Sequence, residues 1–123
     1  MRHKEFNKLL NEILERTTIV LASKSAEYST DEDKLHNFKR AGAMLKCSPE
    51  KALVGMWTKH IISILDMVDK VEYKCGTDAC CFPSFDSEEF IGTLEEKIGD
   101  AINYLILLEA LIKERKKRAD IHG

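Results

Sequence analysis

The stretch "WTKHIISILDMVDK", residues 57–70, decides the fold class. Its isoleucines, leucine and methionine recur every three to four residues, the spacing of one face of an α-helix. Four polar side chains interrupt this apolar pattern: Lys59, His60, Ser63 and Asp66. A second stretch, "EEKIGDAINYLILLEAL" at residues 95–111, combines helical spacing with interior polar groups in the same way. We therefore expect two facing helices whose polar residues form one site.

The chain before the first stretch also has helical patterns. Apolar residues at helical spacing predict a first helix from about Lys4 to Ser25 and a shorter one from about Asp33 to Leu45. In "CSPEKA", Ser48 can cap the free amide groups of a third helix and Pro49 suits its first position, so this helix should run to about Val71. The short helix is expected to bury four residues: Leu35, Phe38, Ala41 and Met44.

A last helix should begin at "DSEE", with Asp86 as its cap and Glu89 as the capping-box acid, and should extend to about Lys117. The segment "TTIVL" favours a strand in isolation, but it lies inside a helical apolar pattern that outweighs this preference. The sequence therefore predicts an all-α fold: a helical bundle of three long helices and one short helix, packed as antiparallel neighbours.

Length and composition narrow the class of protein. A chain of 123 residues suggests a single domain over residues 1–123, and 44% apolar residues with only 2 prolines indicate a folded, helix-rich protein. The net charge of −2 gives no global attraction to nucleic acid, and the cations of "KERKKR" are interpreted as a solvated helix end. No apolar run reaches membrane-spanning length, and "MRHKEFNK" lacks the apolar core of a signal peptide, so we expect a cytoplasmic protein.

The cysteines leave two interpretations open. Cys75, Cys80 and Cys81 lie close together and could hold zinc with His60, although the spacing is not the CxxC pair of a standard zinc finger. With Cys47 they are otherwise ordinary reduced thiols, which is the interpretation that we favour.

The polar residues of the two facing helices predict a magnesium site. Buried carboxylates need an ion pair, hydrogen bonds or a metal, because an uncompensated buried charge is very costly. Hard oxygen ligands on facing helices suit Mg²⁺, which takes one or two carboxylates together with water and substrate phosphates. The predicted metal ligands are Glu96, Asp100 and Asp66. The predicted catalytic residues are His60, as base or phosphate donor, and Asp66.

Other polar residues are candidates for ligand contacts. On the facing helices these are Lys59, Ser63 and Asn103. The segment "EYSTDEDKLHNFKRA", residues 27–41, brings cations and amides near a helix start, where a phosphate could bind. Its candidates are Lys34, His36, Asn37 and Arg40. An exposed charged turn is the alternative for this segment.

A purely structural interpretation also stays open for the facing helices. Lys59 could pair with Glu96 or Asp100, and Asp66 could pair with Lys70. The chain would then be a helical interaction module whose polar residues fix the register of the helices.

Three segments carry a resemblance to a known group. They are "KSAEYSTDEDKLHNFKRA" (24–41), "ALVGMWTKHIISILDMV" (52–68) and "EEKIGDAINYLILLEAL" (95–111). In these segments the chain resembles small bacteriophage proteins and is similar to the all-α nucleotide pyrophosphatase (MazG-like) superfamily. The resemblance implies a helical dimer or tetramer that uses carboxylates and Mg²⁺ to split a nucleoside triphosphate into monophosphate and pyrophosphate.

The chain departs from the catalytic pattern of that superfamily. The superfamily has a Glu-x-x-Asp motif, whereas Lys97 stands three residues before Asp100 here, and Glu96 is the acid that shares its helical face. The preceding helix offers only Asp66 in place of a Glu-x-x-Glu pair. An alternative therefore stays open: a phage protein that sequesters a host nucleotide signal without hydrolysing it.

Overall fold

The computed structural model describes residues 1–28, 33, 35–72 and 87–122, and within these ranges the chain forms four α-helices and no strand. The helices are α1 (His3–Tyr28), α2 (His36–Leu45), α3 (Pro49–Glu72) and α4 (Glu88–His122). The predicted all-α class is confirmed. The expected helix ends lie close to the observed ones, except that α4 continues beyond Lys117 to His122.

Serine hydroxyls cap the N-termini of the two long helices that follow α2. The Ser48 hydroxyl accepts a hydrogen bond of 3.1 Å from the Lys51 N–H, which confirms the predicted cap of α3. The Ser87 hydroxyl likewise accepts a bond of 3.1 Å from the Phe90 N–H, so Ser87 caps α4. The predicted cap, Asp86, lies outside the described residues and is one residue before the observed cap. The cap is Ser87 because the side chain that reaches the free Phe90 amide belongs to the residue three positions before it.

A tight corner joins α2 to α3. Lys46 adopts a left-handed conformation with φ of 56°, and the Cys47 N–H donates a bond of 2.9 Å to the Gly42 carbonyl. A Cβ atom on Gly42 would lie 2.8 Å from the Cys47 carbonyl oxygen and 2.9 Å from the Pro49 nitrogen. The corner therefore requires glycine at position 42.

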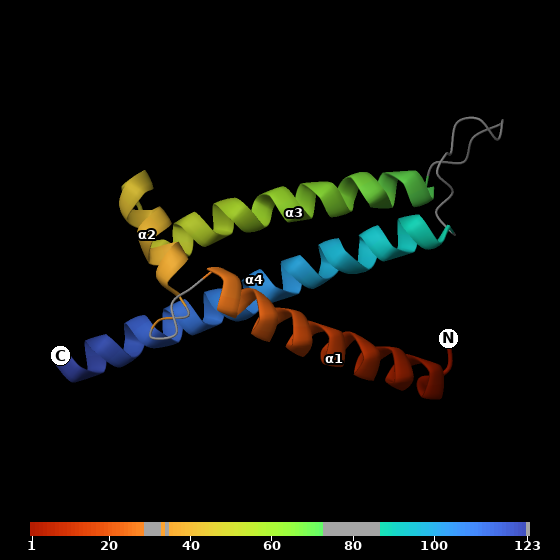
Figure 1. The fold of residues 1–123 in the computed structure, drawn as a ribbon, viewed down its shortest axis with the longest axis horizontal. Helices are drawn as coiled ribbons and strands as arrows, with labels where there is room; N and C mark the ends of the chain where they lie inside the picture. The colour runs from red at the N-terminus through yellow and green to blue at the C-terminus, as the bar shows by residue number, and fades with distance from the viewer. Residues whose placement is uncertain (29–32, 34, 73–86, 123) are drawn as a thin grey trace.

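The helices are not packed equally closely. Figure 1 shows α3 and α4 side by side and antiparallel, with α2 across the start of α3. Helix α1 lies against α4, runs in the same general direction and diverges from it toward the N-terminus. The expectation of antiparallel neighbours therefore holds for α3 and α4 and is wrong for α1 and α4. The buried core joins α2, α3 and α4 through Leu35, Phe38, Leu53 and Leu111.

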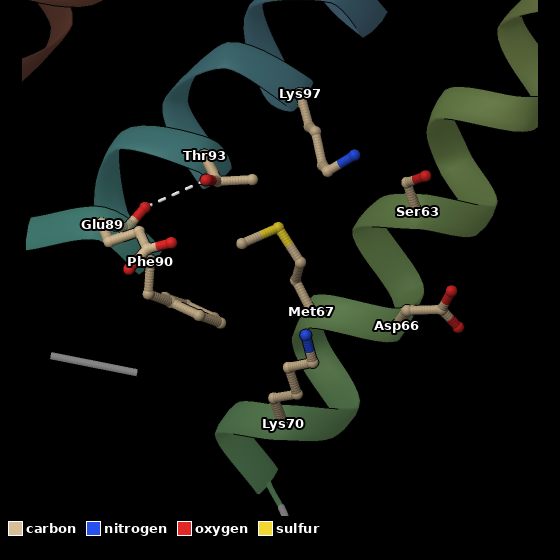
Figure 2. A pocket seen from close by; sticks show the side chains of 8 residues that line it. All are labelled: Ser63, Asp66, Met67, Lys70, Glu89, Phe90, Thr93 and Lys97. Atoms are coloured by element: carbon tan, nitrogen blue, oxygen red, sulfur yellow. Dashed lines mark hydrogen bonds between the residues drawn. The ribbon is translucent and has the colours of Figure 1, made fainter. Parts of the chain in front are cut away.

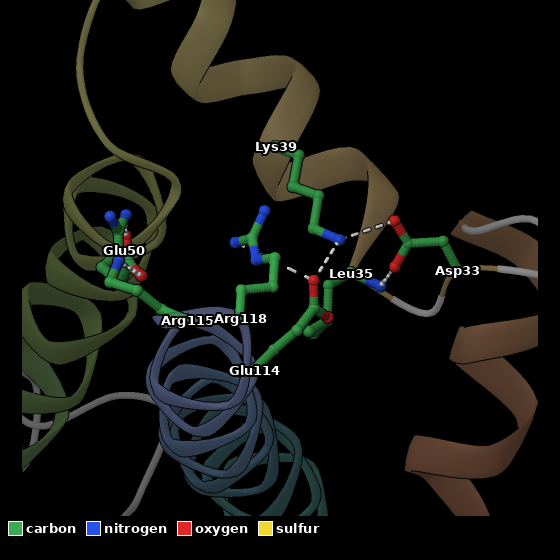
Figure 3. A network of polar contacts seen from close by, with 7 residues as sticks. All are labelled: Asp33, Leu35, Lys39, Glu50, Glu114, Arg115 and Arg118. Atoms are coloured by element: carbon green, nitrogen blue, oxygen red, sulfur yellow. Dashed lines mark hydrogen bonds and ion pairs between the residues drawn. The ribbon is translucent and has the colours of Figure 1, made fainter. Parts of the chain in front are cut away.

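Ion pairs fix the end of α4 to α2 and α3 (Figure 3). Lys39 donates hydrogen bonds to Asp33 (2.8 Å) and to Glu114 (2.6 Å). The bond from Lys39 lowers the pKa of the Asp33 carboxyl, and the same contact raises the pKa of the Lys39 ammonium. The Arg115 guanidinium donates two bonds of 2.8 Å to the Glu50 carboxylate. These contacts set the level at which α4 lies beside α3.

Large apolar side chains remain exposed on every helix. Met44, which was expected in the core, is 78% exposed because it lies on the side of α2 away from α3 and α4. Helix α4 was expected to be buried on several sides, yet Leu105 is 48% and Ile106 43% exposed. None of the described helices combines the length and the apolar character needed to cross a bilayer.

Candidate functional site

Residues packed between α3 and α4 form a seam with a repeat of seven. Four of its members are buried, and the His60 ring stacks on the Tyr104 ring with centroids 5.0 Å apart. The buried members are Leu53, Met67, Phe90 and Leu111. The seam residues are Leu53, His60 and Met67 on α3 and Phe90, Lys97, Tyr104 and Leu111 on α4.

The residues on either side of the seam differ in character. A residue directly before or after a seam residue lies about 100° away from it around the helix. Because α3 and α4 are antiparallel, the preceding residues of both helices fall on one side of the pair and the following residues fall on the other. The preceding residues define the polar side and include Lys59, Asp66, Glu89, Glu96 and Asn103. Asp100, four residues before Tyr104, lies between this side and the seam. The following residues define the apolar side and include Val54, Ile61, Val68, Ile91, Ile98, Leu105 and Ile112.

An open pocket of about 310 Å³ lies on the polar side between α3 and α4. Figure 2 shows the ammonium groups of Lys70 and Lys97 reaching toward Met67 from opposite helices, with the Ser63 hydroxyl nearby. The Thr93 hydroxyl bonds back to the Glu89 carbonyl at 3.0 Å. Two cations beside a serine hydroxyl can bind an anion such as phosphate.

His60 and Asp100 meet next to this pocket. The His60 Nδ1 atom lies 3.9 Å from the nearer Asp100 carboxylate oxygen, which is an ion pair whenever the imidazole carries a proton. The side chain of Asp100 is only 16% exposed and that of His60 29% exposed. The packing of α3 against α4 therefore brings Asp100, a predicted metal ligand, beside His60, the predicted base.

Asn103 lies on the polar side of α4, one turn beyond Asp100, and is 6% exposed. Its amide nitrogen and its amide oxygen are both buried, and neither has a hydrogen-bond partner among the described residues. An unpartnered buried amide is unfavourable in a folded protein, and this one offers two donors and one acceptor. The predicted ligand contact Asn103 is thus a buried group whose hydrogen bonds a ligand could complete.

The predicted metal ligands are not all brought together. Glu96 and Asp100 lie one turn apart on the same side of α4, Glu96 exposed and Asp100 half-buried. Asp66 is exposed, and Figure 2 shows its carboxylate directed away from α4. Across the described ranges, no group of three or more His, Cys, Asp or Glu side chains is arranged to hold a metal ion. Two carboxylates with water and phosphate still suit Mg²⁺, so Glu96 and Asp100 fit this ion. Asp66 of the same chain does not lie beside them.

Several other predicted residues occupy the surface. Lys59 is exposed on the polar side, and Ser63 lines the pocket. On α2, His36 is half-buried whereas Asn37 and Arg40 are exposed. Four predicted residues lie outside the described residues: Lys34, Cys75, Cys80 and Cys81.

The sequence patterns did not identify Lys70 and Lys97 as candidate binding residues. Lys97 was noted only because it replaces an acid of the superfamily motif, and Lys70 only as a partner for Asp66. A signal was present in the repeat of seven, because Lys97 occupies a position between Phe90 and Tyr104 where an apolar residue is expected. A cation at such a position indicates a functional or ion-paired role.

Comparison of the chain with protein-family models, with curated proteins and with solved structures gave no match. The resemblance to the MazG-like superfamily therefore stays a prediction.

Proposed function

We propose that this chain binds a nucleotide together with Mg²⁺ on the polar side of α3 and α4, and that it works as a homo-oligomer, a dimer or a tetramer. The observation that carries the proposal is the buried amide of Asn103, which has no partner among the described residues and lies on α4 one turn beyond Asp100 and two turns beyond the pocket residue Lys97. The rise from Lys97 to Asn103 is about 9 Å along the helix, a length that a nucleotide can span.

Each part of the ligand has a partner of suitable chemistry. Lys70 and Lys97 would bind phosphate oxygens, with Ser63 as a further donor. Glu96 and Asp100 would hold Mg²⁺ against the same phosphates, where the metal supplies positive charge. The Asn103 amide would pair with a base or sugar group.

The other predicted residues take outer positions in this proposal. Lys59 lies on the polar side and can reach an extended phosphate chain. His60, whose Nδ1 atom lies 3.9 Å from the Asp100 carboxylate, would donate to a phosphate oxygen when protonated. His36, Asn37 and Arg40 on α2 belong to a second, peripheral phosphate contact.

Hydrolysis and sequestration are the two forms of this function. Pyrophosphohydrolysis needs carboxylates that activate a water molecule as well as bind metal. The Asp66 carboxylate is directed away from α4 (Figure 2), the helix that carries Glu96 and Asp100, and this favours binding without turnover within one chain. A protein that sequesters a nucleotide signal, as a phage protein acting against host defence would, is therefore the second candidate.

Incubation of the protein with each ribo- and deoxyribonucleoside triphosphate in Mg²⁺ tests the proposal. Retained nucleotide is measured by equilibrium dialysis, and monophosphate and pyrophosphate are measured by ion-exchange chromatography. Lys97→Met should weaken retention about tenfold or more through loss of a charge-assisted bond. The matched control is Lys8→Met, which removes an exposed cation from α1 and should leave retention unchanged. Retention of no nucleotide by the wild type would contradict the proposal.

A further inference from the structure

The last turns of α4 project from the body of the protein. Figure 1 shows α4 continuing past α2 toward the C-terminus. Hydrogen bonds from Arg115 to Glu50 (2.8 Å) and from Lys39 to Glu114 (2.6 Å) hold the base of this segment against α3 and α2. Within residues 112–121, every residue except Glu114 is exposed. Residues 112–122 therefore form a projecting end whose side chains are almost all in contact with solvent.

The projecting end is strongly basic, although the whole chain has a net charge of −2. Its segment "KERKKR", residues 113–118, contains five cations and one glutamate, whereas residues 88–100 of the same helix contain five acids and one lysine. The side chains of Lys116 and Lys117 have no ion pair among the described residues. Lys113 and Arg118 have only exposed pairs within α4, a kind that contributes little to stability. Four cations are therefore free to contact an anionic partner.

The helix dipole does not account for these cations. The sequence patterns predict a helix end near Lys117, where cations would oppose the negative charge of the terminus. The helix instead continues to His122, and its last turn contains Asp120 and no lysine or arginine. Because the dipole acts within the last turn, the basic segment lies before the place where it would serve the helix.

The cations are distributed around the projecting end and do not follow one face. Each residue turns the helix by about 100°, so Lys116 and Arg118 lie about 160° apart around the axis, with Lys113 and Lys117 between them. The two isoleucines of this end are nine residues apart and therefore lie on opposite sides. A helix that rests on a bilayer needs one continuous apolar face, which residues 112–122 lack. Positive charge on two opposite sides instead fits a partner that presents anions on both sides of the helix.

We propose that the projecting end of α4 inserts into the major groove of double-stranded DNA and contacts phosphates on both edges of the groove. A helix with its side chains is about 10–12 Å across, and the groove is about 12 Å wide. The major groove of duplex RNA is too narrow for a helix. Residues 112–122 contain no Phe, Tyr or Trp on which an unpaired base could stack, and no Asn or Gln to pair with adenine. The contact is therefore to duplex DNA and independent of sequence.

This surface is separate from the proposed nucleotide site. Lys116 is nineteen residues beyond the pocket residue Lys97 on the same helix, a rise of about 28 Å. DNA binding by the projecting end therefore does not depend on nucleotide binding on the polar side, and either can fail without the other.

Fluorescence anisotropy of a labelled DNA duplex of about 20 base pairs, measured from about 50 to 200 mM salt, tests the proposal. With four phosphate contacts, the logarithm of the association constant should fall with the logarithm of salt concentration at a slope of about −3 to −4. The double variant Lys116→Gln/Lys117→Gln should bind about tenfold more weakly and lower this slope by about 2. The matched control Lys4→Gln/Lys8→Gln removes two exposed cations from α1 and should bind like the wild type. Circular dichroism of both variants confirms that the helices remain.

Failure to bind duplex DNA would overturn the proposal, as would an equal loss of affinity in the α1 control, which would show an effect of overall charge alone. Tighter binding to single-stranded DNA or to duplex RNA would overturn insertion into the groove. Binding to polyglutamate, or to vesicles of phosphatidylserine and phosphatidylcholine, that matches binding to the duplex would assign the projecting end to an acidic protein or to a lipid surface instead. Equilibrium dialysis of the same variants with nucleotide separates these outcomes from failure of the proposed function, because neither Lys116 nor Lys117 lines the pocket.

Discussion

Replacement of Asn103 by leucine separates a role in ligand binding from a role in the fold. Leucine has the same branching as asparagine but no polar atoms. In the structure the amide nitrogen and oxygen of Asn103 are buried and without partners among the described residues. If a ligand completes these hydrogen bonds, the free protein bears the unfavourable desolvation of both atoms. Asn103→Leu should therefore stabilise the free protein and weaken ligand binding.

The expected size of the stabilisation follows from the two buried atoms. An unsatisfied buried polar group costs about 1–3 kcal/mol, and the larger leucine side chain offsets part of the gain through tighter packing. A net gain of about 1–2 kcal/mol corresponds to a rise in Tm of roughly 3–8 °C for a domain of this size. Asn103→Ala should have little effect on Tm, because it removes the amide but leaves a cavity.

Thermal unfolding followed by circular dichroism, with and without Mg²⁺ and the retained nucleotide, measures both effects. The control Asn11→Leu changes an exposed asparagine of α1 and should shift neither Tm nor affinity appreciably. A lower Tm for Asn103→Leu with unchanged affinity would refute the reasoning, since the amide would then be serving the fold.

Four further substitutions test the corner, the ion pair and the metal. Gly42→Ala should destabilise the protein by about 1–3 kcal/mol, because the new methyl group meets the Cys47 carbonyl. In contrast, Gly92→Ala should stabilise the protein by about 0.5–1 kcal/mol, because its Cβ atom meets nothing within 4 Å. Chemical denaturation measures both changes in the free energy of unfolding. Hydrogen bonds from Arg115 lower the pKa of Glu50 from 4.5 to about 2, so the pair stabilises the fold fully above pH 4.5 and less as the pH falls toward 2. Glu50→Gln should therefore lower Tm at pH 7, and a difference from wild type that persists unchanged at pH 2 would argue against the pair. Mg²⁺ should raise the Tm of the wild type but not of Asp100→Asn, and an equal rise in both would exclude Asp100 as a ligand.

Helical periodicity predicted the fold class because each helix has a local sequence signal. The cap at Ser48 was predictable from "CSPEKA", and the all-α class followed from apolar spacing over residues 57–70 and 95–111. The exposure of Met44 was not predictable, because periodicity identifies a helix face without showing whether another helix covers it.

Which residues of α3 and α4 share the site depends on how far one helix is shifted along the other. The sequence placed Asp66 and Asp100 on facing helices, but it did not fix which turn of α3 lies beside Asp100. The observed level puts His60 there and brings Asp66 to the pocket with Lys97. Contacts distant in the sequence set this level, including the bonds from Arg115 to Glu50, and no local pattern encodes them.

Nuclear magnetic resonance of the ¹⁵N-labelled protein tests most directly whether the polar side of α3 and α4 binds a nucleotide. Each nucleoside triphosphate is added singly with Mg²⁺, and the shifts of the backbone and side-chain amides are followed. For at least one nucleotide, saturable shifts should cluster at Ser63, Thr93 and Lys97 and at the Asn103 side-chain amide. Shifts for no nucleotide, or shifts confined to the exposed cations at the end of α4, would contradict the account.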